Sequence, residues 1–507
     1  MGLMDLCFTT LGLSFAVFIL LFDYMKRRKR WNNYPPGPVS LPFIGNLLQI
    51  NFQCPHVLSV KFGKIFSLQV GWKNVVLLNG LDAVKEALVQ RSDDFADRPP
   101  FSLFDHLGYK KNCEGIMMAR YGHGWKELRR FTLSTLRNFG LGKKSLDQRV
   151  TEEAGCLCSA FSSKDGHPFN PRFLINSAVG NVMCSLTFGN RFEYSNEKFL
   201  RMLHLIEEAF NIGAGIMSQV TLNMMPWLLY IPGPQHNIFQ PYTDSFDILR
   251  EIVKEHKETR DPAFTRDFID AFLEEIEKAK MDPGSTFNEN NLIFTVFDLF
   301  GAATETTTVT LCWALLYMLR YPDVQRRVSP RIPHSGCPCV FHEEIDKVIG
   351  RDRSPEIEDQ VNLPYTNAVV YETQRYCDVV FAGVPRTTCR DTEVQGFFIP
   401  KDTIIIAVLS SVLKDETVWE KPHQFYPEHF LDADGQFVKR EAFLPFSAGR
   451  RMCLGEQLAR KELFLFFTTL LQHFTFHIPE DQPRPREDGH YILIHSPDSY
   501  ELCAIPR

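Results

Sequence analysis

The segment Phe446-Ser-Ala-Gly-Arg-Arg-Met-Cys453-Leu-Gly455 constrains this chain more than any other stretch of its sequence. It places one cysteine in a turn with glycines and arginines, directly before a helical pattern that begins at Glu456. Free N–H groups at a helix N-terminus and nearby cations favour negative charge, so this setting predicts that the Cys453 thiol is held as a thiolate. A thiolate is a soft, strongly donating ligand for iron. The alternative is a buried structural cysteine behind a turn.

The composition is that of a globular protein with a large core. The chain has 507 residues, of which 44% are hydrophobic and 23% are charged. Its formal charge of -6 gives no indication of a nucleic-acid partner. Thirteen cysteines lie without the spacing of a disulfide framework, and their number is odd. This pattern predicts a reducing compartment in which one thiol is chemically special.

The N-terminal sequence predicts a membrane anchor. Leu6 to Phe22 carries no charge and just reaches the length needed to span a bilayer, and the basic run 26–30 follows at once. The positive-inside rule places that run in the cytosol. A cleaved signal peptide would carry its charges before the apolar run instead. We therefore expect an uncleaved anchor over 1–24 with a lumenal N-terminus, a basic and proline-rich hinge over 25–38, and a cytosolic domain over 39–507.

Beyond the hinge, the apolar periodicity is mainly helical. Apolar residues recur at spacings of three and four over 83–92, 123–138, 147–162, 198–211, 245–258, 266–280, 288–320, 362–377 and 455–473. Alternating or continuous apolar runs predict short strands near 65–78, 393–398, 403–409 and, as a pair, 491–504. The predicted fold class is mainly α with a small β region.

Two helical segments carry further charged or polar groupings. In the long helix, Glu305 stands beside Thr306, and an acid next to a hydroxyl on one helix turn can deliver protons to a reaction. Alternatively, such hydroxyls bond back to the preceding turn. Glu372 and Arg375 stand three residues apart, a spacing that allows a local ion pair.

Together, these motifs resemble the cytochrome P450 family over nearly the whole chain. The segment from Phe446 to Gly455 matches the family's haem-binding loop, F-x-x-G-x-R-x-C-x-G, at every defined position. The resemblance implies a fold in which haem b, iron protoporphyrin IX, lies between a long distal helix and the cysteine-bearing loop. Cys453 is then the iron ligand, and Phe446 contacts the cofactor.

The resemblance also implies roles for other residues. Thr306 is the distal threonine and Glu305 its acidic neighbour, although Ala303 stands where the family has glycine. The cationic and indole N–H donors expected at the haem propionates are Trp125, Arg129, Arg386 and Arg451. A surface location on an amphipathic helix is the alternative for these residues.

The Glu372–Arg375 pair corresponds to a buried structural latch behind the haem loop in this family. Its third member normally lies in a P-E-R-F segment, but here the segment is Pro427-Glu-His429-Phe430. Histidine can donate hydrogen bonds, although its charge depends on pH. We therefore expect Glu372, Arg375 and His429 to be essential for the fold and not catalytic.

Strings such as STLRNFGLGKKSL and FLPFSAGRRMCLGE resemble the vertebrate microsomal subfamily of debrisoquine-hydroxylase type. Such relatives oxidise lipophilic small molecules such as xenobiotics and amines, with fatty acids and steroids as other candidates. Asp298 is the carboxylate best placed for a cationic amine, or else it bonds to nearby backbone. The expected pocket walls are 101–118, 205–220, 379–384 and 491–493, and the substrate contacts singled out are Asp298, Ala302, Val380, Val384 and Tyr491.

The implied reaction is monooxygenation at the endoplasmic reticulum membrane. Electrons from NADPH arrive through NADPH-cytochrome P450 reductase, with cytochrome b5 as a further partner and no nucleic acid. The basic residues Arg129, Arg130, Lys143 and Lys144 are candidates for docking the acidic reductase, or else form a solvated face. A peroxide isomerase that needs no reductase is the alternative reaction.

One stretch departs from the family pattern. Residues 329–341 (SPRIPHSGCPCVF) interrupt a helix that continues in relatives, because prolines and a Ser-Gly pair break helices. Cys337, Cys339 and His334 are too few ligands at the usual zinc spacing. The stretch predicts an extruded loop or translated non-coding sequence. The rival function that it allows is a non-catalytic, haem-poor membrane protein.

Overall fold

The protein is described by a computed structural model. The described residues are 14–15, 17–22, 31–42, 44–49, 61–100, 106–107, 115–140, 144–214, 230–231, 233, 237–282, 284–328 and 344–507. By its internal contacts the chain divides into two compact units. Unit 1 comprises residues 1–99, 382–412 and 448–451, and unit 2 comprises residues 100–381, 413–447 and 452–507.

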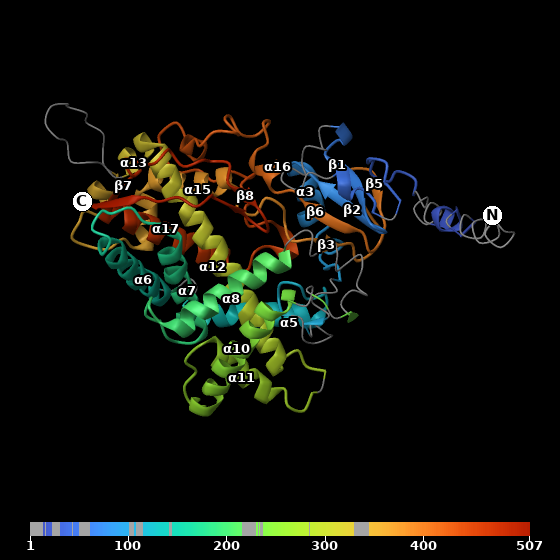
Figure 1. Cartoon of the computed structure of the whole chain (residues 1–507), viewed down its shortest axis with the longest axis horizontal. Coiled ribbons are helices and arrows are strands. Elements are labelled where there is room, and N and C mark those ends of the chain that lie inside the picture. The colour runs from blue at the N-terminus through green and yellow to red at the C-terminus, as the bar shows by residue number, and fades with distance from the viewer. Residues whose placement is uncertain are drawn as a thin grey trace, which may run out of the picture. The chain divides into compact units, whose positions relative to one another are not determined.

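Unit 1 contains a four-stranded sheet with the strand order β1-β2-β6-β3 (Figure 1). β1 (Ile65–Val70) and β2 (Lys73–Leu78) form an antiparallel hairpin, whereas β6 (Ile404–Ala407) lies parallel to β2. β3 (Arg386–Thr387) pairs antiparallel with β6. One face of this sheet is buried because apolar side chains alternate along its strands. Its small core contains Phe66, Leu68, Val75, Leu77 and Val408.

A second hairpin in unit 1 joins β4 (Thr392–Val394) to β5 (Phe397–Ile399). Its two turn residues, Gln395 and Gly396, have φ values of 47° and 81°, which is the left-handed conformation that tight two-residue hairpins require. The remaining short elements of the unit are η1 (Leu47–Gln49), α3 (Leu81–Lys85), η2 (Glu86–Gln90) and η7 (Gly449–Arg451), and α16 (Ser410–Leu413) follows β6 along the chain.

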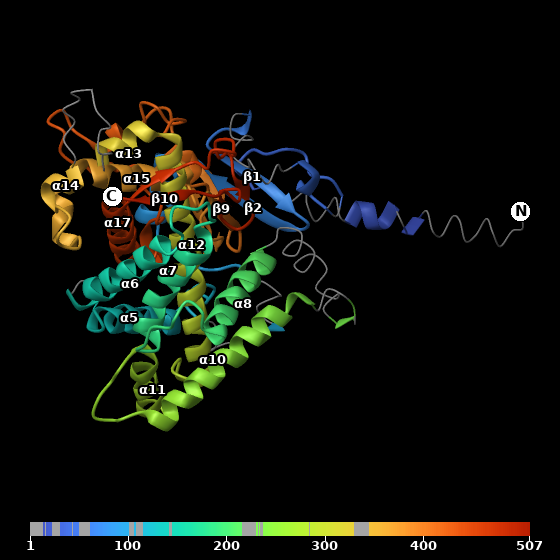
Figure 2. The same cartoon turned by 60° about the vertical axis from the view of Figure 1, so that its left-hand side comes forward.

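Unit 2 is mainly helical and is built around one long helix, α12 (Glu289–Arg320). The other helices are α5 (His123–Asn138), α6 (Lys144–Ser162), α7 (Arg172–Thr187), α8 (Glu197–Ala214), α10 (Gln240–Thr259), α11 (Phe268–Lys278), α13 (Pro322–Val328), α14 (Glu344–Val348), η5 (Ile357–Asn362), α15 (Pro364–Cys377), η6 (Pro427–Phe430) and α17 (Glu456–His473). The Asn288 side chain begins α12 by accepting the N–H of Asn291 at 3.0 Å. α7, α8, α10, α15 and α17 pack around α12, which is therefore buried along most of its length (Figure 2).

Unit 2 also holds two small antiparallel pairs. β8 (His490–Tyr491) pairs with β9 (His495–Ser496), and β7 (Phe474–His477) pairs with β10 (Cys503–Pro506). The strand pair expected near 491–504 is thus two different pairings, because the strand after α17 takes β10 as its partner.

The predicted fold class is confirmed: the described chain is mainly helical with small sheets. Each helical segment expected from the periodicity coincides with a helix. The periodicity missed α7, which is buried on nearly every side. A helix without a polar face has no apolar stripe to reveal it.

The chain on either side of the predicted 329–341 insert is held in place, while the insert lies outside the described residues. α13 ends at Val328, which is buried. α14 begins at Glu344, whose carboxylate accepts the backbone N–H groups of Tyr365 and Thr366 at 2.9 and 2.7 Å. Glu344 therefore caps the N-terminus of α15.

The predicted anchor lies largely outside the described residues. Residues 14–15 and 17–22 are helical, and Phe15 and Phe18 are exposed there. Within the described part of the chain, α12 is the helix that is long and apolar enough to span a bilayer, but most of it is buried in the protein. That burial is typical of a core helix.

Candidate active site

The chain around Cys453 forms a closed loop that leads into α17. The backbone N–H of Cys453 donates to the carbonyl oxygen of Phe446 at 3.0 Å. Ser447 and Gly449 have positive φ values of 59° and 74°. A side chain at Gly449 is excluded, because a Cβ there would meet the Leu88 carbonyl oxygen at 1.6 Å. The glycine of the motif therefore permits a close approach between backbone segments.

Cys453 is exposed as a residue, but its sulfur atom is closely surrounded by other protein atoms. This burial raises the pKa of the thiol, and the Glu456 carboxylate raises it further. The N–H groups at the start of α17 and the Arg129 guanidinium lower the pKa, as the sequence suggested, but by less. The prediction that these groups alone hold a thiolate is therefore wrong. A coordinated metal ion would be needed to deprotonate the thiol.

α5 brings Arg129 to the cysteine loop. Arg129 Nη2 donates to the carbonyl oxygen of Met452 at 2.6 Å, and its guanidinium lies 5.5 Å from the centre of the Trp125 ring. The indole N–H of Trp125 donates to the carbonyl oxygen of Ile116 at 3.1 Å. The Trp125 N–H that the sequence assigned to a propionate is thus bonded to backbone, and Trp125 meets Arg129 through its ring.

The other two predicted propionate donors lie in unit 1. Arg386 Nη2 donates to the carbonyl oxygen of Ala448 at 3.0 Å, and Arg451 Nε donates to that of Ala96 at 2.8 Å. Both arginines are buried. Their hydrogen bonds fix both guanidinium groups to the backbone of this unit.

One face of α12 is uncovered in the middle of the helix. Leu299, Ala302, Ala303 and Thr306 are half-buried or exposed, whereas their neighbours along the helix are buried. Their spacing of three and four residues places them on one face. The side chains at 302 and 303 are the small methyl groups of alanine. This face includes the predicted distal threonine.

Thr306 and Glu305 make their hydrogen bonds on different sides of α12. The Thr306 hydroxyl donates back to the carbonyl oxygen of Ala302 at 2.7 Å. The Glu305 carboxylate accepts Arg172 Nη2 at 2.5 Å, and the same nitrogen donates to Glu207 at 2.9 Å. Burial raises the pKa of Glu305, Arg172 partly counteracts this, and Glu207 adds to it. Arg172 was not predicted from the sequence, and Glu207 was predicted only as part of the 205–220 pocket wall.

The Asp298 carboxylate is directed at backbone. Its Oδ2 accepts the N–H groups of Ile116 and Met117 at 2.7 and 2.9 Å, and the residue is 5% exposed. Gly115 makes this possible, since a Cβ there would lie 2.4 Å from Asp298 Oδ2. These bonds favour the structural alternative for Asp298 over the amine-binding one.

Parts of the predicted substrate pocket come together in unit 2. The ring of Phe381 lies 5.1 Å from that of Tyr491, centre to centre, and His495 donates its N–H to Val379 at 2.8 Å. Val380, between Val379 and Phe381, is half-buried. Val384 belongs to unit 1 and is 38% exposed. Residues 101–105, 108–114 and 215–220 of the predicted walls lie outside the described residues.

Glu372 and Arg375 form a completely buried pair on α15. Arg375 Nε and Nη2 each donate to one Glu372 oxygen at 2.7 Å, which is bidentate geometry. The remaining N–H groups of Arg375 donate to the carbonyl oxygens of Leu413, Pro422 and Gln424. Every N–H group of the guanidinium therefore has an acceptor.

His429 completes this cluster, as the sequence predicts. Its Nε2 accepts the N–H of Lys421 at 3.1 Å, and its Nδ1 lies 3.2 Å from Glu372 Oε2. Because Nε2 accepts, Nδ1 carries the hydrogen and donates to Glu372. A neutral histidine therefore satisfies both bonds in the place where relatives have arginine.

α17 carries a buried acid that the sequence analysis did not single out. Glu462 is fully buried and accepts the Thr307 hydroxyl at 3.4 Å. Burial raises its pKa to about 8, and Thr307 counteracts only part of this. Burial therefore favours the neutral acid form of Glu462, which joins α17 to α12 one residue beyond Thr306.

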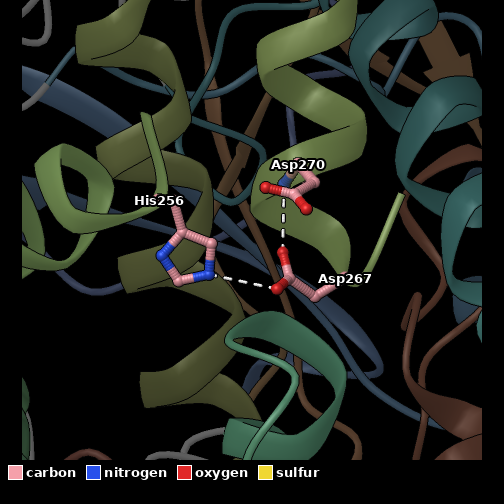
Figure 3. Close-up of side chains that lie close together, drawn as sticks. All are labelled: His256, Asp267 and Asp270. Carbon is pink, nitrogen blue, oxygen red and sulfur yellow. Dashed lines mark hydrogen bonds and ion pairs between the residues drawn. The ribbon is translucent and has the colours of Figure 1, made fainter. Parts of the chain in front are cut away.

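His256, Asp267 and Asp270 have ligand atoms within 4.8 Å of one another, as a metal site would (Figure 3). Asp267 Oδ1 caps α11 by accepting the N–H of Asp270 at 3.0 Å, and Arg266 donates to both Asp270 oxygens. His256 Nε2 lies 3.0 Å from Asp267 Oδ2, and its Nδ1 lies 2.8 Å from the Ile252 carbonyl oxygen.

Both ring nitrogens of His256 thus face acceptor oxygens, so both carry hydrogens and the ring is a cation. Burial lowers the pKa of His256, but the bond to Asp267 and its charge outweigh this, and the pKa is raised. A cationic imidazole has no lone pair for a metal. The cluster is therefore a charged cap of α11.

Known proteins match this chain over nearly its whole length. The family model for cytochrome P450 matches residues 35–504. Cytochrome P450 2D15 of Canis lupus familiaris is 53% identical over 503 residues, which cover 98% of both chains. Cytochrome P450 2D6 of Homo sapiens is 54% identical and a protein named vitamin D(3) 25-hydroxylase of Sus scrofa 53%, each again over 98% of both chains.

Proposed function

The chain belongs to the cytochrome P450 family and is a monooxygenase of that family, and from this premise we propose that it hydroxylates lipophilic small molecules with electrons from NADPH. The electrons arrive through NADPH-cytochrome P450 reductase. One oxygen atom of dioxygen enters a C–H bond, and the other leaves as water with two electrons and two protons. The observation that carries this proposal is the closed loop that holds Cys453, an exposed residue, directly before α17.

The residues of unit 2 fit haem b. Cys453 is an exposed residue, and the partly exposed face of α12 carries two alanines. α12 and α17 pack together and are joined through Thr307 and Glu462. In this family haem supplies the activation of dioxygen, aided by thiolate donation. Cys453 would hold the iron, and Phe446 would contact the cofactor beside it.

The propionates of haem need cationic partners, and three arginines would provide them. Arg129 is attached to the cysteine loop within unit 2, and Arg386 and Arg451 are fixed to backbone within unit 1. Trp125 supports Arg129 through its ring. Thr306, on the open face of α12, would hold a proton near the reacting atoms, with Glu305 as the acid that supplies it.

The substrate proposal is lipophilic and does not require an amine. Val380, Tyr491 and Ala302 offer apolar contact surface, together with Val384. Asp298 has its carboxylate bonded to two backbone N–H groups. A cationic substrate would therefore have to compete with those bonds. Xenobiotics and other neutral lipophilic molecules, including steroid-like ones, are the class that we propose.

The proposed location is the endoplasmic reticulum membrane, with residues 1–24 as the anchor and residues 39–507 in the cytosol. The relatives are cytochromes P450 of matching length, and Leu6 to Phe22 carries no charge. Arg130 and Lys144 are exposed and basic, so they suit the acidic surface of the reductase, with cytochrome b5 as a further electron donor.

A reduced carbon-monoxide difference spectrum tests the iron ligand. The wild-type protein should give the red-shifted Soret band of a haem-thiolate, and Cys453→Ser should lack it and lose turnover. Cys156→Ser, which changes a half-buried cysteine on α6, is the matched control and should keep both. A normal spectrum in Cys453→Ser would contradict the assignment. Product formation from a peroxide without NADPH or reductase would favour the isomerase alternative.

A further inference from the structure

Unit 2 contains a cavity of about 290 Å³ that reaches α12 at Glu305 and is lined by both charged and apolar side chains. Its walls come from α7, α8, α12 and the chain of the β8–β9 hairpin with the residues that follow it. The titratable groups that share the cavity with Glu305 are Arg172, Glu207, Cys312, His490, Asp498 and Tyr500. The cavity therefore brings charged groups to α12 at Glu305, whereas Thr306 is not among the residues that line it.

Within this cavity, Arg172 connects two carboxylates through one nitrogen atom. Its Nη2 lies 2.5 Å from Glu305 and 2.9 Å from Glu207. The side chains of Arg172 and Glu207 are 32% and 30% exposed, whereas that of Glu305 is 11% exposed. A small rotation of the guanidinium can therefore release the buried carboxylate while keeping the outer one.

We propose that Arg172 is a positioning residue that controls when Glu305 takes up a proton from the water of this cavity. This inference rests on the proposed monooxygenase function, for which Glu305 is the proton donor. Arg172 acts through Glu305, to which it is joined by an ion pair.

The surrounding charges determine the sign of the effect. Burial raises the pKa of Glu305, Arg172 lowers it and Glu207 raises it. Burial also raises the pKa of Cys312 to about 12, so this thiol is neutral at pH 7, and burial keeps Tyr500 neutral in the same way. His490 lies 3.3 Å from Asp498, so these two groups partner each other. Arg172 and Glu207 are therefore the charges that act on Glu305 most directly.

The proton balance of the step is simple. When Glu305 separates from Arg172, its carboxylate accepts one proton from a hydronium ion in the cavity and becomes a neutral acid. It later gives up this proton toward the Thr306 side and pairs with Arg172 again. Each turnover consumes two protons with two electrons per dioxygen, so Glu305 must be reprotonated from the cavity for each proton that passes this way.

Two substitutions should move the proton affinity of Glu305 in opposite directions. Infrared difference spectra recorded during a pH titration report the carboxylic acid C=O band, and its loss in Glu305→Gln assigns the band. Arg172→Gln should raise the midpoint of that band by about one pH unit, or tenfold in proton affinity, and Glu207→Gln should lower it. Midpoints that coincide in the wild type and both variants would overturn the proposal.

Turnover provides the second readout. With Arg172→Gln, the ratio of product to NADPH consumed should fall severalfold, and its pH profile should shift in the same direction as the infrared band. Arg201→Gln, an exposed residue on α8 outside this cavity, is the matched control and should change neither. An unshifted profile in Arg172→Gln would also overturn the proposal. Absence of product in every protein, with the infrared shifts intact, would instead refute the proposed function and leave the Arg172–Glu305 coupling in place.

Discussion

A fully buried and a partly exposed Glu–Arg pair of unit 2 use the same residue types in opposite ways. Around Arg375, every N–H group has its own acceptor, and both side chains of the pair are 0% exposed. Around Arg172, one nitrogen atom serves two carboxylates, and the guanidinium is 32% exposed beside a cavity. The first arrangement has no alternative geometry with as many bonds. The second has one within a small rotation.

This difference shows when a buried ion pair stabilises a fold and when it can take part in a reaction. A saturated pair is rigid because any movement leaves a buried charge without a partner. A shared donor next to water has a low barrier to exchange, since water can replace a lost bond. We expect substitutions to separate the two pairs by their effects on stability.

The largest effect is expected from truncation of Arg375. Arg375→Ala leaves the Glu372 charge buried and three carbonyl oxygens without a donor, so the free energy of unfolding should fall by about 3–5 kcal/mol. Arg172→Ala should lower it by about 1 kcal/mol or less, because that pair is partly exposed. Denaturant unfolding of both proteins measures the difference.

A matched control exists on the surface. Arg351 lies 3.5 Å from Asp346 and is 46% exposed, so Arg351→Ala should have almost no effect. Equal destabilisation by Arg375→Ala and Arg172→Ala would contradict the proposed difference between the two Glu–Arg pairs. Haem content, followed by the carbon-monoxide spectrum, should decline in Arg375→Ala in parallel with stability.

An intermediate effect is expected from the third member of the saturated cluster. His429→Ala leaves the Lys421 N–H without its acceptor and removes one donor to Glu372, so about 1–3 kcal/mol of stability should be lost. His429→Arg should restore the donor to Glu372 but not the acceptor for Lys421. Complete recovery in His429→Arg would show that the Lys421 bond contributes nothing.

The smallest effect concerns the charged cap of α11, and it depends on pH. The folded state raises the pKa of His256 above the ordinary value of 6.5. The stabilisation from His256 is therefore complete below pH 6.5 and is lost as the pH rises through the raised pKa, a change of about 1 kcal/mol. His256→Gln should remove this pH dependence, as thermal unfolding between pH 6 and 9 can show. The same slope in wild type and variant would contradict the cationic assignment.

The sequence predicted the helices that have an apolar stripe. It also predicted the cysteine loop from Phe446 to Gly455, because the residues of that loop match a motif. It also predicted the Glu372–Arg375–His429 contact, including the histidine that replaces arginine. Glu305 and Thr306 were found as neighbours along the chain. The directions in which the Glu305 and Thr306 side chains point could not be predicted, because they depend on which helix packs against which side of α12.

The features that could not be predicted all depend on packing between segments that are far apart along the chain. α7 is buried on nearly every side, so it shows no amphipathic pattern, and its first residue is Arg172, the partner of Glu305. The pKa of Cys453 was predicted in the wrong direction because burial cannot be read from neighbours in the sequence. Asp298 likewise depends on a backbone turn at Gly115 that is far away along the chain.

The C-terminal end of α13 and the N-terminal end of α14 can be altered separately. Val328 is buried on one side, and Glu344 caps α15 on the other, so the two ends of the connection are fixed independently. Each of these helix ends therefore has an anchor of its own within unit 2, and a substitution at Val328 can be made without touching the residues of the Glu344 cap.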